Sequence, residues 1–233
     1  MSRGRDVPRW GNLRRSNPFS ESYGYDRGQP VDRFYIADFL VANVADIRGD
    51  VLEVKEPLYT DRFGRTAVQH SHVVDIDATN PNATIVADLC QRGSLPRARF
   101  DCFIMTQTLH LLPDLSAALE NAWQALAPGG ALLITVPTVA RVDPQVPDFD
   151  FYRLTPKGLH HMLTSALPAA EVQVQGYGNL LASIGFLLGL AAEEFTRQEL
   201  MHLDASFVAL SCARVKKGLL QQGVSGSDRP SAA

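Results

Sequence analysis

The feature that most constrains this fold is an alternation, along the chain, of short strand-like apolar runs with segments of helical spacing. Strands that alternate with helices build a mostly parallel sheet with helices on both faces. The predicted strands are 51–54, 70–76, 83–87, 100–105, 131–136, 172–175 and 207–215, and the predicted helices are 32–43, 114–126, 155–165 and 180–202. Ligands of such sheets bind at the carboxyl ends of the strands, so the residues just after each strand are the functional candidates.

The composition is that of one globular domain with two polar ends. Of the 233 residues, 45% are apolar and 20% are charged, a balance that excludes disorder of the whole chain. Residues 23–217 are predicted to form the domain, residues 1–22 a flexible basic arm, and residues 218–233 a disordered tail. The net charge of -3 argues against a general nucleic-acid binder, which needs a broad basic face.

The arm concentrates positive charge. Residues 1–15 contain five arginines against the single acidic residue Asp6, a local net charge of +4. A basic segment with Pro and Gly and no hydrophobic periodicity is predicted to be solvated and mobile. Contact with an RNA or with a membrane stays open as the alternative.

Cysteine usage indicates a reducing compartment. Cys90, Cys102 and Cys212 form no CxxC pair, and the last two stand in strand-like apolar runs, where cysteine behaves as a small hydrophobe. No apolar segment follows the N-terminal arginines, so no signal peptide is predicted. The longest apolar stretch, residues 180–192, is too short to span a bilayer. We therefore expect a cytoplasmic protein without a membrane span.

Polar side chains follow the first four predicted strands. They are Glu53, then Asp75 and Asp77, then Asp88, then Thr106 and Gln107. An acidic residue about 20 positions after the first strand is placed to accept hydrogen bonds from ribose hydroxyls, which fits Asp75 and Asp77. Asp88 is placed to accept from an adenine amino group. The alternative is that these residues only cap helices and solvate loops.

Five short motifs also follow one another in a characteristic order. They are Val51-Leu52-Glu53-Val54, Val74-Asp75-Ile76-Asp77, Ala87-Asp88-Leu89, an aspartate-led strand from Phe100 to Gln107, and Leu126-Ala127-Pro128-Gly129-Gly130-Ala131-Leu132. Over residues 30–215 this order resembles the class I S-adenosylmethionine-dependent methyltransferases. Segments 23–33 and 176–179 look like a methyltransferase type 11-like bacterial subgroup often met among polysaccharide and natural-product genes.

The resemblance implies a Rossmann-like, seven-stranded, mostly parallel sheet whose last strand is antiparallel, with S-adenosyl-L-methionine as cofactor. It also implies individual roles at the strand ends. Glu53 would meet the methionine amino group, and Asp77 would hold the ribose, with Asp75 as the alternative. The remaining cofactor contacts that it implies are Asp88 and Leu89 around the adenine, and Thr106 and Gln107 along the methionine moiety and the reaction centre.

The turn after the first strand departs from the family pattern, which has glycines in the form E/D-x-G-x-G. Here Glu53 is followed by Val54-Lys55-Glu56-Pro57. Glycines in such a turn take positive φ and let the backbone approach a ligand. Lys55 is expected to pair with the methionine carboxylate instead. The alternative is that Lys55 fills the pocket and leaves a site without cofactor.

Candidates for the chemistry lie past the fourth strand and before the first. Methyl transfer requires the acceptor to be aligned, and a hydroxyl acceptor also needs a base. His110 is the candidate base, with a structural role as the alternative. No metal site is predicted, because His70-x-His72 lacks a complete ligand set.

Segment 23–48, which precedes the first strand, is expected to be a lid. The candidate substrate or lid residues are Tyr23, Arg27, Asp32, Arg33, Tyr152 and Arg153; ordinary surface pairing or helix packing is the alternative for them.

These observations predict a methyltransferase that acts on a hydroxyl of a sugar or of a small natural-product scaffold. The altered turn keeps two alternatives open: a non-catalytic partner with the same fold, and an enzyme that binds the cofactor without moving its methyl group. The expected partner is a small-molecule or glycan acceptor rather than a nucleic acid. A homodimer also stays open.

Overall fold

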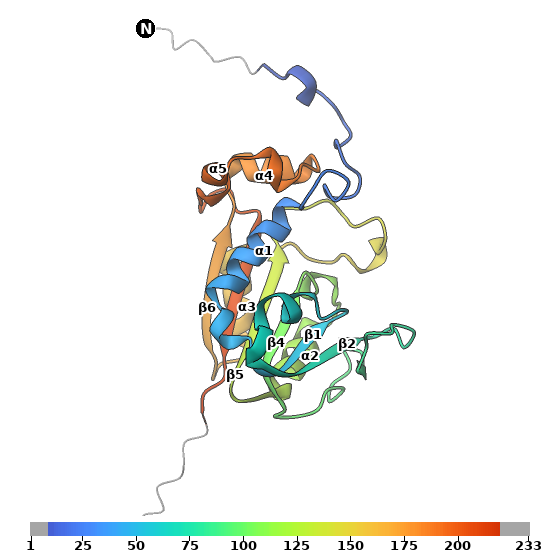
Figure 1. Ribbon diagram of the computed structural model, residues 1–233, viewed down its shortest axis with the longest axis vertical. Helices are drawn as coiled ribbons and strands as arrows, with labels where there is room; N and C mark the ends of the chain where they lie inside the picture. Colours follow the sequence, from blue (N-terminus) through green and yellow to red (C-terminus); the bar gives the residue numbers. More distant parts are fainter. Residues whose placement is uncertain (1–8, 220–233) are drawn as a thin grey trace, which may run out of the picture.

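The computed structural model describes residues 9–219, which fold around a seven-stranded sheet in the order β3-β2-β1-β4-β5-β7-β6 (Figure 1). Strands β1 to β5 are parallel, and β7 is antiparallel to both β5 and β6. The predicted sheet with an antiparallel last strand is therefore confirmed. The strands are β1 (Gly49–Val54), β2 (Val68–Asp75), β3 (Ile85–Val86), β4 (Phe100–Thr106), β5 (Leu126–Pro137), β6 (Glu171–Tyr177) and β7 (Leu210–Lys216).

Helices cover both faces of the sheet. They are α1 (Val31–Ala42), α2 (Leu115–Ala125), α3 (Pro156–Ala166), α4 (Leu180–Leu187) and α5 (Arg197–Met201). Successive residues of β4 point to opposite faces: Phe103 and Met105 pack with α2 and α3, whereas Cys102 and Ile104 pack with α1 and α4. Within residues 9–219 no helix combines the length and apolar character needed to cross a bilayer.

The cysteines fit the expected use as small hydrophobes. Cys102 and Cys212 are buried, and all three cysteines are free thiols. Burial raises the pKa of both buried thiols, so they are not reactive thiolates at neutral pH. The cytoplasmic location that we expect from the cysteine content stays a prediction.

The predicted continuous helix over 180–202 is wrong. Helix α4 ends at Leu187, and Gly189 then takes a φ of +71° where a Cβ atom would lie 2.4 Å from the carbonyl oxygen of Ser20. Helix α5 restarts only at Arg197, where Thr196 and Glu199 form a capping box. The glycine is thus required both for the turn and for the close approach of the N-terminal segment.

Several other boundaries differ from the sequence prediction. The third strand is only Ile85–Val86, shorter than 83–87. The last strand begins at Leu210 rather than at 207, because the N–H of Phe207 turns back to the carbonyl of Asp204. The fifth strand begins at Leu126 rather than at 131, so Pro128-Gly129-Gly130 lie inside β5, where its pairing with β4 is irregular. Most of the predicted tail lies outside the described residues.

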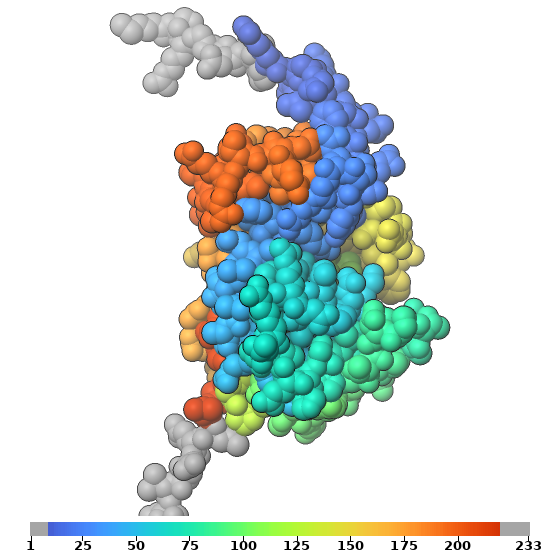
Figure 2. Space-filling view, in the orientation of Figure 1, coloured from blue at the N-terminus to red at the C-terminus, as the bar shows by residue number. Residues whose placement is uncertain are grey.

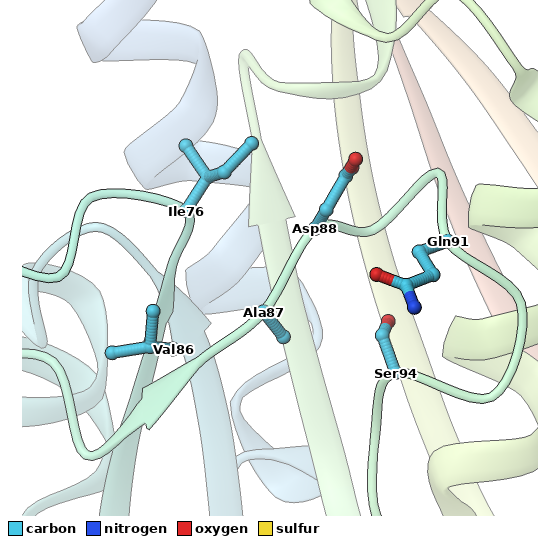
Figure 3. Close-up of a pocket in the computed structure, with 6 residues that line it drawn as sticks. All are labelled: Ile76, Val86, Ala87, Asp88, Gln91 and Ser94. Carbon is cyan, nitrogen blue, oxygen red and sulfur yellow. The ribbon is translucent and has the colours of Figure 1, made fainter.

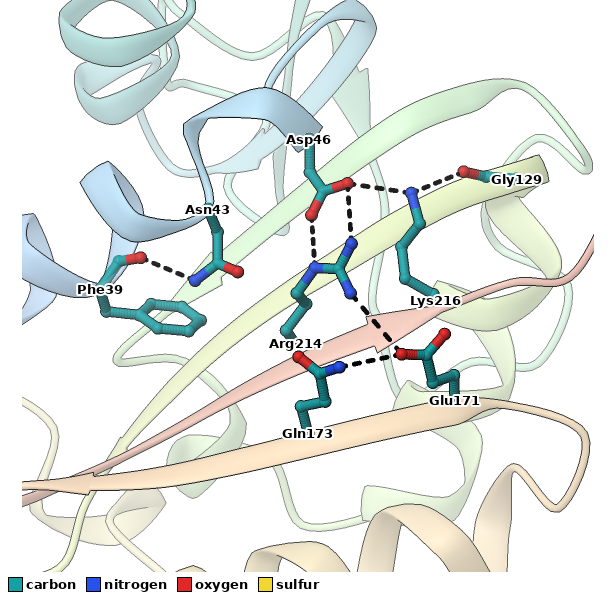
Figure 4. A network of polar contacts seen from close by, with 8 residues as sticks. All are labelled: Phe39, Asn43, Asp46, Gly129, Glu171, Gln173, Arg214 and Lys216. Atoms are coloured by element: carbon teal, nitrogen blue, oxygen red, sulfur yellow. Dashed lines mark hydrogen bonds and ion pairs between the residues drawn. The ribbon is translucent and has the colours of Figure 1, made fainter.

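The amino edge of the sheet is held by an ion-pair network (Figure 4). Asp46 accepts hydrogen bonds from Arg214 Nε at 2.6 Å and Lys216 Nζ at 2.9 Å, and Lys216 also donates to the carbonyl of Gly129. Burial alone would raise the pKa of Asp46, but these two cations outweigh it and lower the pKa. A depression of about 460 Å³ beside the network is lined in part by Arg48. These contacts fix β7 to the segment that precedes β1.

Candidate functional site

The predicted crevice lies at the carboxyl edge of the sheet, where β1 and β4 are neighbours. The chain proceeds outward from β1 through β2 to β3, and in the other direction from β4 to β5. Such a reversal leaves a crevice between the loops of the two strands, and open α/β sheets bind their ligands there. The loops after β1, β2, β3 and β4 therefore define the candidate site.

The turn after β1 closes on the buried carboxylate of Glu53. This carboxylate accepts hydrogen bonds from the backbone N–H of Tyr59 at 3.0 Å, from the N–H of Thr60 at 2.8 Å and from the Thr60 hydroxyl at 2.7 Å. Burial raises the pKa of Glu53 to about 7, although the three hydrogen bonds lower it. Glu53 thus holds the turn over the strand end, and its contact with a methionine amino group stays a prediction.

Lys55 occupies the place where the family pattern has its first glycine. Its φ is +73°, a left-handed conformation that costs a non-glycine residue about 1–3 kcal/mol. The backbone shape of the glycine turn is therefore kept without the glycine. The Lys55 side chain is exposed and is not buried in the crevice. Its pairing with a methionine carboxylate stays a prediction.

Asp75 and Asp77 hold the loop after β2 in different ways. Asp75 accepts from the N–H of Asp77 at 3.0 Å and from Asn80 Nδ2 at 2.6 Å, so both its oxygens are engaged. Asp77 is exposed, and one of its oxygens accepts two hydrogen bonds from Thr79, which lower its pKa. Within residues 9–219 the other oxygen of Asp77 accepts none. The structure thus leaves Asp77 the freer acceptor, but neither ribose assignment is tested.

A depression of about 270 Å³ lies at the carboxyl ends of β2 and β3 (Figure 3). Ile76 and Val86 line it with side chains that are 69% and 57% exposed, while Asp88 and Gln91 stand on the opposite side. Asp88 Oδ1 accepts from the N–H of Cys90, which leaves Oδ2 available to a donor. The depression therefore has apolar side chains on one side and hydrogen-bonding groups on the other, and such polar groups can fix the orientation of a ligand.

Leu89, which we expected beside the adenine, is buried in the core that α2 covers. Its backbone carbonyl accepts a hydrogen bond from Asn121 Nδ2 at 2.8 Å. Leu89 therefore anchors the loop that contains Asp88 to the core. Direct contact of Leu89 with a ligand stays a prediction.

Gln107 connects the end of β4 to the start of α1. Its Nε2 donates to Asp32 Oδ2 at 2.9 Å, and its φ of +47° turns the chain away from the preceding Thr106. The Oε1 atom of Gln107 is buried and has no hydrogen-bond partner among the described residues. An unpaired buried acceptor costs about 1–3 kcal/mol, so this atom is expected to meet a donor on a ligand.

Asp32 and Arg33 lie at this junction, and their expected role as lid or substrate residues stays a prediction. The Arg33 guanidinium lies 3.3 Å from Asp32 Oδ2, and its Nε donates to the Tyr25 hydroxyl at 2.9 Å. Asp32 is buried, so it is not a free surface carboxylate. These contacts link segment 20–33 to the end of β4.

His110 is also buried, and its Nδ1 atom has no partner among residues 9–219. Burial lowers the pKa of His110 to about 4, although the nearby carboxylate of Asp150 raises it. The ring is neutral near pH 7. Arg153 is held by an ion pair with Asp150, with Nη2 2.7 Å from Oδ2, and the Tyr152 hydroxyl donates to the carbonyl of Pro113. The expected roles of these residues toward a substrate are untested.

The expected lid is fastened to the region after α4. Arg27 pairs with Glu194, with Nε 2.9 Å from Oε2, and the ring of Tyr23 stacks on Phe186 at 6.5 Å between centroids. The arrangement places segment 20–33 beside the carboxyl edge. Whether the segment opens and closes stays a prediction.

Sequence reasoning missed several residues of this edge. They are Tyr59 and Thr60, which bind Glu53, and Ile76, Val86, Gln91 and Ser94, which line the depression. Ile76 and Val86 carried a signal in the sequence, because each is a large apolar residue at a strand end, one or two positions from an aspartate. Tyr59 and Thr60 carried none, since their contacts with Glu53 depend on how the turn folds back over the strand end.

Known proteins resemble this chain in sequence pattern and in fold. A family model described as a methyltransferase domain matches residues 12–171. An S-adenosylmethionine-dependent methyltransferase from Mesorhizobium loti has a TM-score of 0.54 at 15% identity, over 83% of this chain and 100% of that one. The N-methyltransferase NodS from Bradyrhizobium japonicum, solved with S-adenosyl-L-homocysteine, has a TM-score of 0.53 at 14% identity, over 88% and 94%.

The [4+2]-cyclase SpnF has a TM-score of 0.50 at 14% identity, over 87% of this chain and 87% of that one. A search of the curated proteins finds no match. At such identities the solved structures establish the fold alone.

Proposed function

Because the chain belongs to the methyltransferase domain family, we propose that it is an S-adenosylmethionine-dependent methyltransferase that binds its cofactor along the carboxyl ends of β1 to β4. Two features at this edge fit the cofactor. The depression beside Ile76 and Val86 offers apolar walls to an adenine ring, and the unpartnered Oε1 of Gln107 offers an acceptor to an ammonium group. When bound, the cofactor supplies an electrophilic methyl group.

The unpartnered Gln107 oxygen is the observation that carries the proposal. A folded protein rarely buries an acceptor without a donor, so the atom favours a ligand that brings one. Gln107 would meet the methionine end of the cofactor. At the adenosine end, Asp77 would accept hydrogen bonds from the ribose hydroxyls, with Asp75 as the alternative. Asp88 would accept from the adenine amino group, and Lys55 would pair with the methionine carboxylate.

We propose a hydroxyl of a sugar or of a small natural-product scaffold as the acceptor. The neutral imidazole of His110 has a free Nδ1 atom and can take the proton of such a hydroxyl. With a pKa of about 4 it is a weak base in the free protein, so this role requires acceptor binding to raise its pKa. A carboxylate acceptor would need no base. His110→Gln is expected to lower turnover while leaving cofactor affinity unchanged.

The turn without glycine favours the two alternatives, a non-catalytic partner and an enzyme that binds the cofactor without transferring its methyl group. The similarity in fold to a protein named a [4+2]-cyclase also favours the second. The three functions differ in two observables: whether the protein binds the cofactor, and whether it releases S-adenosylhomocysteine.

Titration calorimetry with S-adenosylmethionine and S-adenosylhomocysteine tests the proposal. Both ligands should bind, and Ile76→Asp should weaken both at least roughly tenfold, because it places a charge against the adenine. Val44→Asp, also at an exposed apolar residue but near the amino edge, is the matched control and should bind normally. If neither ligand binds the wild-type protein, the proposal is wrong and the non-catalytic partner is the function that remains. Binding without release of S-adenosylhomocysteine across an acceptor panel would favour the third function.

A further inference from the structure

The outer face of α4 is apolar and exposed. Leu180, Leu181, Ile184 and Leu187 lie on one side of the helix and are 42–49% exposed, whereas the other side, which includes Phe186, is buried. Residues 176–192 contain no charged side chain. An exposed face of this kind marks a surface for contact with a protein or a membrane. We call these four residues the α4 outer face.

The basic arm starts beside this face. The N–H of Phe19 donates to the carbonyl oxygen of Leu188 at 2.7 Å, which fixes the arm to the end of α4 (Figure 2). In residues 9–15 of the arm, every charged or large apolar residue is exposed. These residues are Arg9, Trp10, Leu13, Arg14 and Arg15. Positive charge and a tryptophan therefore flank the α4 outer face.

Two carboxylates that follow α4 are engaged by the segment that precedes α1, whereas Glu21 of the arm is exposed. Glu194 pairs with Arg27, and Glu193 accepts a hydrogen bond from the N–H of Gln29 at 2.9 Å. Their charges are partly compensated there. The arginines of the arm have no such carboxylate partners among residues 9–219, so they can meet negative charge from outside.

We propose that the α4 outer face and the basic arm together form a docking surface for an anionic lipid bilayer. Leucine and tryptophan side chains that enter the headgroup region, flanked by arginines that meet anionic headgroups, are the known pattern of peripheral membrane contact. Helix α4 and the described part of the arm lie at the same end of the molecule, so one membrane can approach both (Figure 1). The proposal does not depend on methyl transfer.

The arm also argues against a second copy as the occupant of this face. A two-fold dimer whose axis passes near the arm would bring the two sets of arginines together, because the same patch of each copy takes part. Like charges held close together oppose such contact. An anionic membrane can bury the apolar face and pair with the arginines of the basic arm, whereas a second copy can only bury the face.

Vesicle flotation with the full chain tests the proposal. The wild-type protein should float with vesicles that contain phosphatidylglycerol and not with pure phosphatidylcholine, and added salt should weaken binding. Ile184→Ser with Leu187→Ser should reduce the partition coefficient roughly tenfold or more through the lost apolar contact. Arg9→Gln with Arg14→Gln should reduce it roughly fivefold for each arginine. Val44→Ser and Arg97→Gln, at exposed residues elsewhere, are matched controls and should not change it.

Circular dichroism and thermal melting establish that each variant is folded, and sedimentation equilibrium reports its association. Absence of wild-type binding to the anionic vesicles would overturn the proposal. Equal binding of the wild-type protein and both paired variants would also overturn it. A dimer that is lost only in the Ile184→Ser and Leu187→Ser protein, without vesicle binding, would assign the face to a second copy instead.

Discussion

Glu53→Gln is expected to change stability by an amount that depends on pH. Burial raises the pKa of Glu53 from its ordinary value of 4.5 to about 7 in the folded protein. A group with a raised folded pKa contributes stability below its unfolded pKa, and this contribution is lost as the pH rises through the folded pKa. The shift corresponds to about 3 kcal/mol of unfolding free energy, lost between about pH 4.5 and pH 7.

The variant has a different dependence because glutamine does not titrate. At pH 5, Glu53→Gln should destabilise the protein by about 1–2 kcal/mol, since the amide nitrogen cannot accept a hydrogen bond from Tyr59 or Thr60. By pH 8 the wild-type protein has lost the contribution from Glu53. The variant should then be as stable as the wild type or more stable. Urea unfolding of both proteins at pH 5, 6, 7 and 8 measures the difference, in which the other titrating groups cancel.

Asp46→Asn is the matched control for this series. The pKa of Asp46 is lowered, so the stability that its charge contributes is present above the unfolded pKa and lost only as the pH falls below about 4. Its destabilisation should therefore be constant from pH 5 to pH 8. A Glu53→Gln penalty that is also constant over this range would refute the reasoning. It would mean that the three hydrogen bonds keep the Glu53 carboxylate ionised despite its burial.

Three further predictions concern the cofactor and the lid. Asp77→Ala should weaken cofactor binding by about 1–3 kcal/mol in calorimetry, through the lost acceptor for the ribose; normal binding by Asp77→Ala and loss in Asp75→Ala would reverse that assignment. Lys55→Ala should weaken binding of S-adenosylmethionine more than binding of adenosine. Equal losses of affinity for both ligands would contradict the pairing with the methionine carboxylate, and a gain in affinity would indicate that the Lys55 side chain blocks the site. Deletion of residues 1–15 should leave activity and melting temperature nearly unchanged, and deletion of residues 1–30 should keep a folded core but lose most turnover. Limited proteolysis is the direct check of the lid, because bound cofactor should slow cleavage after Arg27 and Arg33 but not after Arg9 or Arg14. Cleavage that is indifferent to cofactor at all four sites would contradict the lid.

The fold could be predicted because its signals are local. Apolar runs marked the strands of the central sheet, and the predicted helices over 114–126 and 155–165 correspond to α2 and α3. The break at Gly189 could not be predicted from such signals. Its cause is the approach of Ser20, which is distant in the sequence.

The candidate site was only partly accessible to sequence reasoning for the same physical reason. Position after a strand correctly placed Asp88 and Gln107 at the carboxyl edge. It could not show that Gln107 binds Asp32, or that Glu53 is enclosed by a turn that begins several residues later. Such contacts depend on how loops pack, which no spacing rule in the sequence encodes.

Hydrogen–deuterium exchange with S-adenosylhomocysteine tests the central claim most directly, because the structure has depressions at opposite edges of the sheet. The account predicts slower exchange at the carboxyl edge, in residues 55–60, 76–78, 86–91 and 106–110, and unchanged exchange around Arg48 at the amino edge. Protection confined to the amino edge, or no protection at either edge at saturating ligand, would contradict it.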